Sequence, residues 1–96
     1  YHVAVSTHNY NSTTVGLAAT IHAAAGMPNF LITEYFVNLR DIAAQIAVNP
    51  PAVEKGYIAI PTAPGLGIDL DERALQQYAD TERPARQFRS SADEGP

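Results

Sequence analysis

The first 34 residues alternate between short apolar runs and one apolar helix, and this pattern constrains the fold more than any other feature. Residues 1–6 are rich in strand-forming side chains, and residues 29–34 form a second short run of this kind. Residues 13–25 between them are apolar on nearly every face, which is typical of a buried helix. A strand, a buried helix and a strand in this order predict a βαβ unit, whose two strands are parallel.

Residues with well-known positional preferences mark both ends of the predicted helix. Ser12 or Thr13 is expected to cap the first turn through its side-chain oxygen. Gly26 stands where a left-handed C-terminal cap would be, and Pro28 prevents the helix from continuing. The helix is therefore expected to end near Ala25.

A histidine and a glutamate follow or finish the two predicted strands. His8 comes shortly after the first strand, and Glu34 ends the second. Because the strands of a βαβ unit end at the same edge of the sheet, we expect these two side chains to share one site there. Simpler interpretations also exist. His8 could be a hydrogen-bonded loop residue, and Glu34 could pair with an arginine such as Arg40.

Shorter sequence signals predict the secondary structure in the middle of the chain. Residues 37–48 are expected to contain one or two helical turns, which the sequence Asn49-Pro50-Pro51 brings to an end. Residues 54–56 predict a turn that leads into a strand at residues 57–60.

The last third of the chain combines a glycine-rich turn, a short helix and a polar end. The two glycines in residues 64–67 predict a turn with an unusual backbone conformation. Asp69 or Asp71 is expected to cap a short helix that reaches Tyr78. Residues 79–96 are polar and aperiodic, so we expect them to form a flexible tail.

Composition and charge exclude several classes of site and partner. The chain has no cysteine, which excludes disulfides, thiolate zinc sites and cysteine nucleophiles. A net charge of −4 with six Lys plus Arg gives no electrostatic footprint for nucleic acid or an anionic membrane. No apolar run and no signal-like segment points to a membrane or to secretion, so a cytoplasmic location is expected. His22 lies within the apolar helix and is expected to be a hydrogen-bonded structural residue.

The order of the segments resembles one enzyme family. His8 after a strand, then "GLAATIHAAAGMPNF", "LITEYF" and "GYIAIPTAPGLGIDLDERALQQY", are similar to the C-terminal end of the mandelate racemase and muconate lactonizing enzyme family. This family is part of the enolase superfamily. The chain most resembles its acid-sugar dehydratases of the galactonate dehydratase kind, over residues 1 to about 78.

The resemblance implies an α/β fold in which this chain is the C-terminal piece of a modified (β/α) barrel. On that template residues 1–49 supply the last βαβ unit of the barrel, and residues 50–78 return towards an α+β capping domain. The chain starts at Tyr1 instead of Met, and we expect it to be roughly the last quarter of a full enzyme. Its implied partners are the remainder of the barrel and the capping domain, and the full-length enzyme is expected to be a homo-oligomer.

The resemblance also implies a chemistry. The family abstracts the proton α to a carboxylate and depends on Mg²⁺, so the expected activity is that of a carbon–oxygen lyase that dehydrates a sugar acid. His8 matches the histidine that acts as general base, or as the acid that helps hydroxide leave. Glu34 matches the glutamate that, in its protonated form, hydrogen-bonds the substrate carboxylate. Both residues are thus expected to be catalytic and substrate-binding.

No residue of this chain is expected to bind the metal. The acidic residues after Glu34 do not match the family's metal ligands, so the resemblance implies that the Mg²⁺ ligands lie outside these 96 residues. Two strands cannot close a barrel, and the 96 residues alone are expected to be inactive.

Two alternatives remain open from the sequence. A racemase or cycloisomerase of the same family would share the proton abstraction without the loss of water. A non-catalytic stand-alone α/β module is the other interpretation. An isolated pair of strands beside an apolar helix would expose a large apolar surface, which disfavours the stand-alone module.

Overall fold

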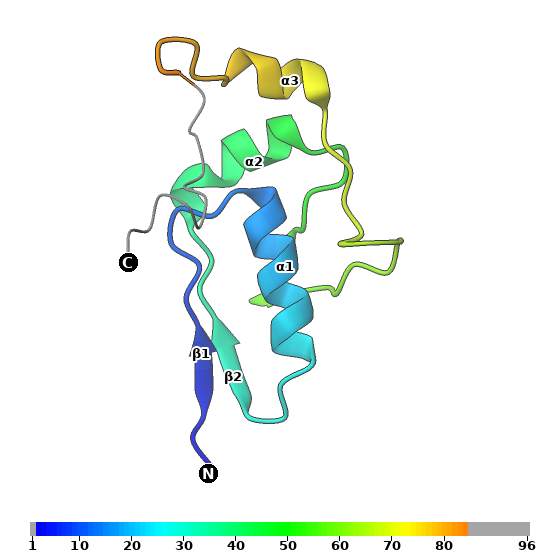
Figure 1. The fold of residues 1–96 in the computed structure, drawn as a ribbon. Helices are drawn as coiled ribbons and strands as arrows, with labels where there is room; N and C mark the ends of the chain where they lie inside the picture. The colour runs from blue at the N-terminus through cyan, green and yellow to red at the C-terminus, as the bar shows by residue number, and fades with distance from the viewer. Residues whose placement is uncertain (1, 85–96) are drawn as a thin grey trace, which may run out of the picture.

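The computed structural model describes residues 2–84 as a mixed α/β arrangement (Figure 1). The elements in chain order are β1 (Val5–Thr7), α1 (Thr14–Ala25), β2 (Phe30–Thr33), the 3-10 turn η1 (Val37–Leu39), α2 (Arg40–Ile46), β3 (Val53–Glu54), β4 (Tyr57–Ile58) and α3 (Glu72–Gln77).

Strands β1 and β2 form a parallel pair, and α1 connects them. The predicted parallel arrangement is confirmed, although each strand is shorter than the sequence suggested. The register pairs Val5 with Phe30 but Ser6 with Ile32, so the ladder skips Leu31. This irregularity is a bulge of one residue, which changes which side chains of the two strands lie opposite each other.

Helix α1 buries one face. The side chains that carry this face are Leu17, Ala18, Ile21 and Ala24. The opposite face is open, and Val15 on it is 41% exposed. The expectation of a helix buried on every side is therefore wrong for the described residues, because the strand pair and α2 cover α1 from one direction only. Ile46 and Ala47, at the end of α2, complete the buried apolar core.

Both ends of α1 differ from the sequence expectation. Thr13 is the N-cap residue, but its side chain makes no capping hydrogen bond, so the predicted cap through Ser12 or Thr13 is wrong. The buried Thr14 instead donates its hydroxyl proton to the Ala43 carbonyl of α2, at 3.1 Å. Gly26 is right-handed, with φ −86° and ψ −5°. The left-handed cap is not needed because the last turn tightens, with the Gly26 N–H donating to the Ala23 carbonyl at 3.2 Å.

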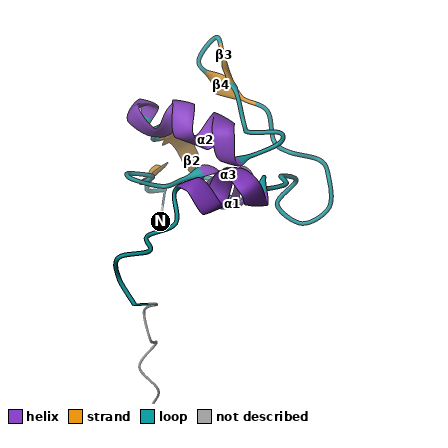
Figure 2. Ribbon diagram, turned by 90° about the horizontal axis from the view of Figure 1, so that it is seen from above, coloured by secondary structure: helices purple, strands orange, loops and turns teal. Residues whose placement is uncertain are grey.

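Strands β3 and β4 form a two-residue antiparallel hairpin that Figure 2 shows set apart from the helices. Its turn residues Lys55 and Gly56 have φ values of 50° and 84°. Positive φ at both central positions is the requirement of a type I′ turn, whose twist matches that of a hairpin. The predicted turn is confirmed. The strand that follows it spans only Tyr57–Ile58, and its partner β3 was not predicted.

The glycine-rich turn has the predicted unusual backbone. Gly65 and Gly67 have φ values of 67° and 71°. A Cβ on Gly67 would lie 2.4 Å from Pro61 Cβ, so this position also requires glycine sterically. The Asn49 side chain holds the turn from the other side. Its Nδ2 donates to the Gly67 carbonyl at 3.0 Å, and its Oδ1 accepts from the Asp69 N–H at 2.8 Å.

Helix α3 begins at a side-chain cap and packs beside α2 (Figure 1). Asp71 Oδ1 accepts hydrogen bonds from the N–H groups of Arg73 and Ala74, at 2.9 and 3.0 Å. Of the two candidate caps, Asp71 is therefore the one used. The Tyr78 hydroxyl donates to the Gln45 side-chain oxygen and ties the end of α3 to α2.

The region after α3 is described only as far as residue 84. Residues 79–84 contain neither helix nor strand. The remainder of the predicted tail, residues 85–96, lies outside the described residues. Within residues 2–84, no helix has both the length and the apolar character that crossing a bilayer requires.

Replacing the cap of α3 should destabilise the chain. We expect Asp71→Ala to lower the free energy of unfolding by about 1 kcal/mol, because two N–H groups of the first turn lose their acceptor. The measurement is denaturant unfolding followed by circular dichroism. Asp69→Ala is the matched control, since the Asp69 carboxylate makes no hydrogen bond among the described residues. Equal losses in the two variants would contradict the assignment of Asp71 as the cap.

Replacing Asn49 should also lower the free energy of unfolding. Asn49→Ala removes both hydrogen bonds to the glycine-rich turn, and we expect it to lower the free energy of unfolding by about 1–2 kcal/mol. Asn38→Ala is the control, because Asn38 is exposed and its side chain makes no hydrogen bond in the described part of the chain. A loss at Asn49 no larger than that at Asn38 would show that the turn holds its shape without this residue.

Candidate active site

His8 and Glu34 lie side by side at the ends of the two parallel strands. The Glu34 N–H donates to the Thr7 carbonyl at 3.1 Å, which extends the strand pairing one step beyond β2. The imidazole Nε2 of His8 is 3.6 Å from Oε2 of Glu34. The structure thus places the two residues together, as the strand arrangement predicted. Their chemical roles stay predictions.

The bulge in the strand pair makes this meeting possible. After the bulge, Thr7 pairs with Thr33, so the next residues along the two chains are His8 and Glu34. If the ladder did not skip Leu31, counting along the two strands from the Val5–Phe30 pair would place His8 opposite Thr33 and not opposite Glu34. A Thr7–Thr33 hydrogen bond of 2.7 Å between the two hydroxyls fastens the strands directly below the site.

Asn9 holds the Glu34 carboxyl group. Its backbone N–H donates to Oε2 of Glu34 at 2.9 Å. Asn9 is only 3% exposed. Its side-chain Oδ1 lies 3.4 Å from the Thr20 hydroxyl on α1. Sequence reasoning missed Asn9, because a backbone N–H contact leaves no mark on the choice of side chain.

The two oxygens of Glu34 are in different situations. Oε2 makes both the Asn9 and the His8 contacts. Oε1 has no hydrogen bond among the described residues and is the oxygen available to a ligand. The alternative partner, Arg40, contacts Asp41 instead, at 3.3 Å from Nε to Oδ1. Within residues 2–84, the partners of the Glu34 side chain are thus His8 and Asn9.

The site is open to solvent in this chain. The His8 side chain is 82% exposed and that of Glu34 is 43% exposed. Together with four further strand residues they line a pocket, and these four are Ser6, Thr7, Ile32 and Thr33. An accessible imidazole beside a carboxyl group can exchange a proton with a bound molecule while the carboxyl group binds a polar group of the same molecule.

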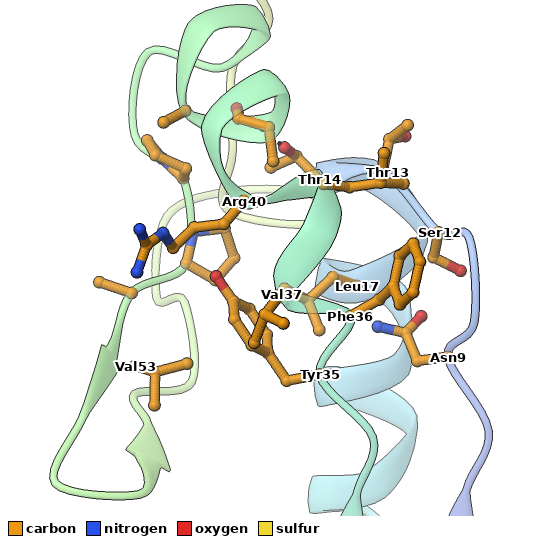
Figure 3. A pocket seen from close by; sticks show the side chains of 16 residues that line it. Asn9, Ser12, Thr13, Thr14, Leu17, Tyr35, Phe36, Val37, Arg40 and Val53 are labelled. Atoms are coloured by element: carbon orange, nitrogen blue, oxygen red, sulfur yellow. Dashed lines mark hydrogen bonds between the residues drawn. The ribbon is translucent and has the colours of Figure 1, made fainter.

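A second cavity of about 480 Å³ contains Asn9 but neither His8 nor Glu34. Figure 3 shows its wall, with Asn9 and Phe36 on one side and Arg40 and Val53 on the other. The cavity is therefore separate from the His8–Glu34 pair.

The described residues do not fit a magnesium site. Within residues 2–84, no group of three or more His, Asp or Glu side chains could hold a metal ion. Glu34 has an imidazole and a backbone N–H at Oε2, whereas Mg²⁺ prefers an octahedron of oxygen ligands. We therefore derive no chemical step through a metal from these residues.

His22 makes a hydrogen-bond contact, as predicted. Its Nε2 is 3.2 Å from the Leu66 carbonyl in the glycine-rich turn. The contact joins α1 to this turn, and the other two histidines take no part in it.

Comparison with known proteins identifies relatives of this arrangement. The family described as enolase C-terminal domain-like matches residues 1–74. A D-galactonate dehydratase family member from Musicola paradisiaca is 34% identical over 64 residues, which is 67% of this chain and 15% of that protein. The D-xylonate dehydratase of Haloferax volcanii is 31% identical over 78 residues, which is 81% of this chain and 19% of that protein.

A solved structure shows the same fold. It comes from Burkholderia SAR-1 and is described as that of a mandelate racemase/muconate lactonizing enzyme. The TM-score is 0.74 at 36% sequence identity, and the match covers 88% of this chain and 21% of that one. This chain thus spans only about a fifth or less of the length of these relatives. With a family match over most of its residues and dehydratases among its relatives, the chain belongs to the enolase C-terminal domain-like family of the enolase superfamily.

Proposed function

We propose that this chain contributes His8 and Glu34 to the active site of an enzyme that removes water from a sugar acid. The observation that carries the proposal is the 3.6 Å approach of His8 and Glu34 at the ends of two parallel strands. The dehydratases among the relatives support a carboxylate substrate and an elimination of water.

The reaction begins at the carbon next to the substrate carboxylate. A base takes the α proton, and the electron pair of the broken C–H bond moves towards the carboxylate and forms an enediolate. Loss of the hydroxyl group from the β carbon, together with a proton, then releases water and leaves an enol, which tautomerises to a 2-oxo acid. His8 is the base in the first step or the proton donor in the second, and an imidazole suits both because its charge changes near neutral pH.

Glu34 binds the substrate carboxylate in this proposal. Asn9 donates to Oε2 and so fixes the orientation of the carboxyl group. The proton then belongs on Oε1, from which Glu34 donates a hydrogen bond to a substrate oxygen. This bond strengthens as negative charge develops on that oxygen in the transition state, which is the condition for it to accelerate the reaction.

The remaining parts of the enzyme lie outside this chain in the proposal. Residues 1–49 are then the end of a (β/α) barrel, and residues 50–78 lead to its capping domain. Val3, Leu31 and Ile32 are exposed apolar residues in or beside the strand pair, and further barrel strands would cover them. A stand-alone module would leave this surface in water. Magnesium dependence, homo-oligomer formation and a cytoplasmic location remain predictions.

The test uses the full-length protein that contains these residues. Incubation with a panel of sugar acids should yield 2-oxo acids, and His8→Asn should lower kcat by about 10²- to 10⁴-fold by removing the acid–base group. His2→Asn is the matched control, because His2 lies outside the site and its φ of 51° is one that asparagine tolerates. Full activity of His8→Asn would remove His8 from the mechanism.

Glu34 gives a second and sharper test. Gln has the shape of protonated Glu: its carbonyl oxygen can accept from Asn9 and its amide can donate to the substrate. We expect Glu34→Ala to lower kcat by about 10²- to 10³-fold and Glu34→Gln to keep most of the activity. An equal loss in both variants would contradict the role of Glu34 as a hydrogen-bond donor.

Proton exchange separates the remaining alternatives. In D₂O, loss of α-proton exchange in His8→Asn identifies His8 as the base, whereas retained exchange without water loss identifies it as the acid. Exchange by the wild type without any 2-oxo acid would instead favour a racemase or cycloisomerase. The similarity to the Burkholderia SAR-1 structure is the observation that supports this second function.

A further inference from the structure

An aromatic row continues outward from the His8–Glu34 pair. The ring centroids of His8 and Tyr10 are 6.4 Å apart, and the two ring planes are within 23° of each other. The Tyr10 ring in turn packs against Phe36, with centroids 4.8 Å apart and an angle of 58°. Both distances fall in the range of favourable aromatic contacts.

Tyr10 and Phe36 occupy equivalent positions, each three residues after the end of its strand. Tyr10 comes two residues after His8, and Phe36 comes two residues after Glu34. The two ring contacts place this aromatic pair next to the His8–Glu34 site.

His8 needs such a neighbour, because little else holds its ring. The side chain is 82% exposed, and its Nε2 reaches Glu34 only at 3.6 Å. The torsion that turns a histidine ring has a broad energy minimum, so an imidazole without a packing partner samples many orientations. A nearly parallel neighbouring ring, with its centroid 6.4 Å away, limits this rotation. Phe36 packs against Tyr10, which is 57% exposed, and so helps to hold the Tyr10 ring in place.

We propose that Tyr10, held by Phe36, is a positioning residue that fixes the plane of the His8 imidazole with Nε2 facing Glu34 and the bound substrate. The proposal rests on the function proposed above. The aromatic ring carries the effect, since the Tyr10 hydroxyl makes no hydrogen bond among residues 2–84. Proton transfer depends steeply on the alignment of the reacting atoms, so a loosened imidazole should slow the chemical step and leave substrate binding almost unchanged.

The experiment compares Tyr10→Phe, Tyr10→Leu and Tyr10→Ala in the full-length protein, with sugar acids that the wild type dehydrates. We expect Tyr10→Ala and Tyr10→Leu to lower kcat by about fivefold to tenfold with KM changed less than about twofold. Tyr10→Phe keeps the ring and should retain wild-type kcat. Tyr57→Ala, which removes an exposed tyrosine from the hairpin, is the matched control and should leave kcat unchanged.

A spectroscopic measurement reports on the ring contact without turnover. In protein labelled with ¹³C-histidine, the Hε1 signal of His8, assigned by its loss in His8→Asn, should move when the ring current of Tyr10 is removed. The signal should shift in Tyr10→Ala and Tyr10→Leu and stay near its wild-type position in Tyr10→Phe. A merely structural role of Tyr10 would lower thermal stability without this pattern.

The outcomes separate the two proposals. Wild-type kcat and an unmoved His8 signal in Tyr10→Ala and Tyr10→Leu would overturn the inference alone. A loss in Tyr10→Phe as large as in Tyr10→Ala would also overturn it, because the hydroxyl and not the ring would then act. An inactive wild type, or a fully active His8→Asn, would overturn the proposed function, and this inference with it.

Discussion

The parallel pairing of β1 with β2 is the constraint on which the site depends. Side chains on a strand alternate between two faces, so a shift of one residue moves a side chain to the other side. The bulge at Leu31 sets the register in which His8 comes level with Glu34. The Thr7–Thr33 hydroxyl contact and the Glu34 N–H bond to Thr7 hold that register beside the site. The chemistry proposed for the pair thus rests on backbone geometry two or three residues away.

The residues after the strands connect this register to the rest of the molecule. Asn9 supports Glu34 through its backbone N–H, while its side chain is buried towards Thr20 on α1. Tyr10 lies next to His8 and packs against Phe36. Asn9, which contacts α1, therefore restrains Glu34, and the aromatic pair lies beside His8. The pair remains open to solvent in this chain, as expected if other parts of an enzyme complete the site.

Local sequence signals correctly predicted those elements that depend on residues close together in the chain. The parallel strands around a helix, the Gly65 and Gly67 turn, and the tight turn before Tyr57 follow from periodicity and from residues with special backbone preferences. The sequence limited the N-cap of α3 to two candidates, Asp69 and Asp71, because each stands close enough to the start of the helix to cap its first turn. The predicted caps of α1 were wrong: the Thr14 hydroxyl makes a tertiary contact with Ala43 of α2, and Gly26 closes the helix with a local right-handed turn.

The sequence by itself determined the order of the elements apart from β3, the family and the two residues most suited to the chemistry, since these depend on residue types and on spacing along the chain. Only the tertiary structure decided how they meet. The bulge at Leu31 sets the register of the two strands, the Asn9 N–H reaches Glu34 across the strand pair, and the Tyr10 ring lies beside His8 on the same segment. Such contacts do not require particular residue types at a fixed spacing, so no sequence pattern predicts them. They depend on the three-dimensional path of the chain.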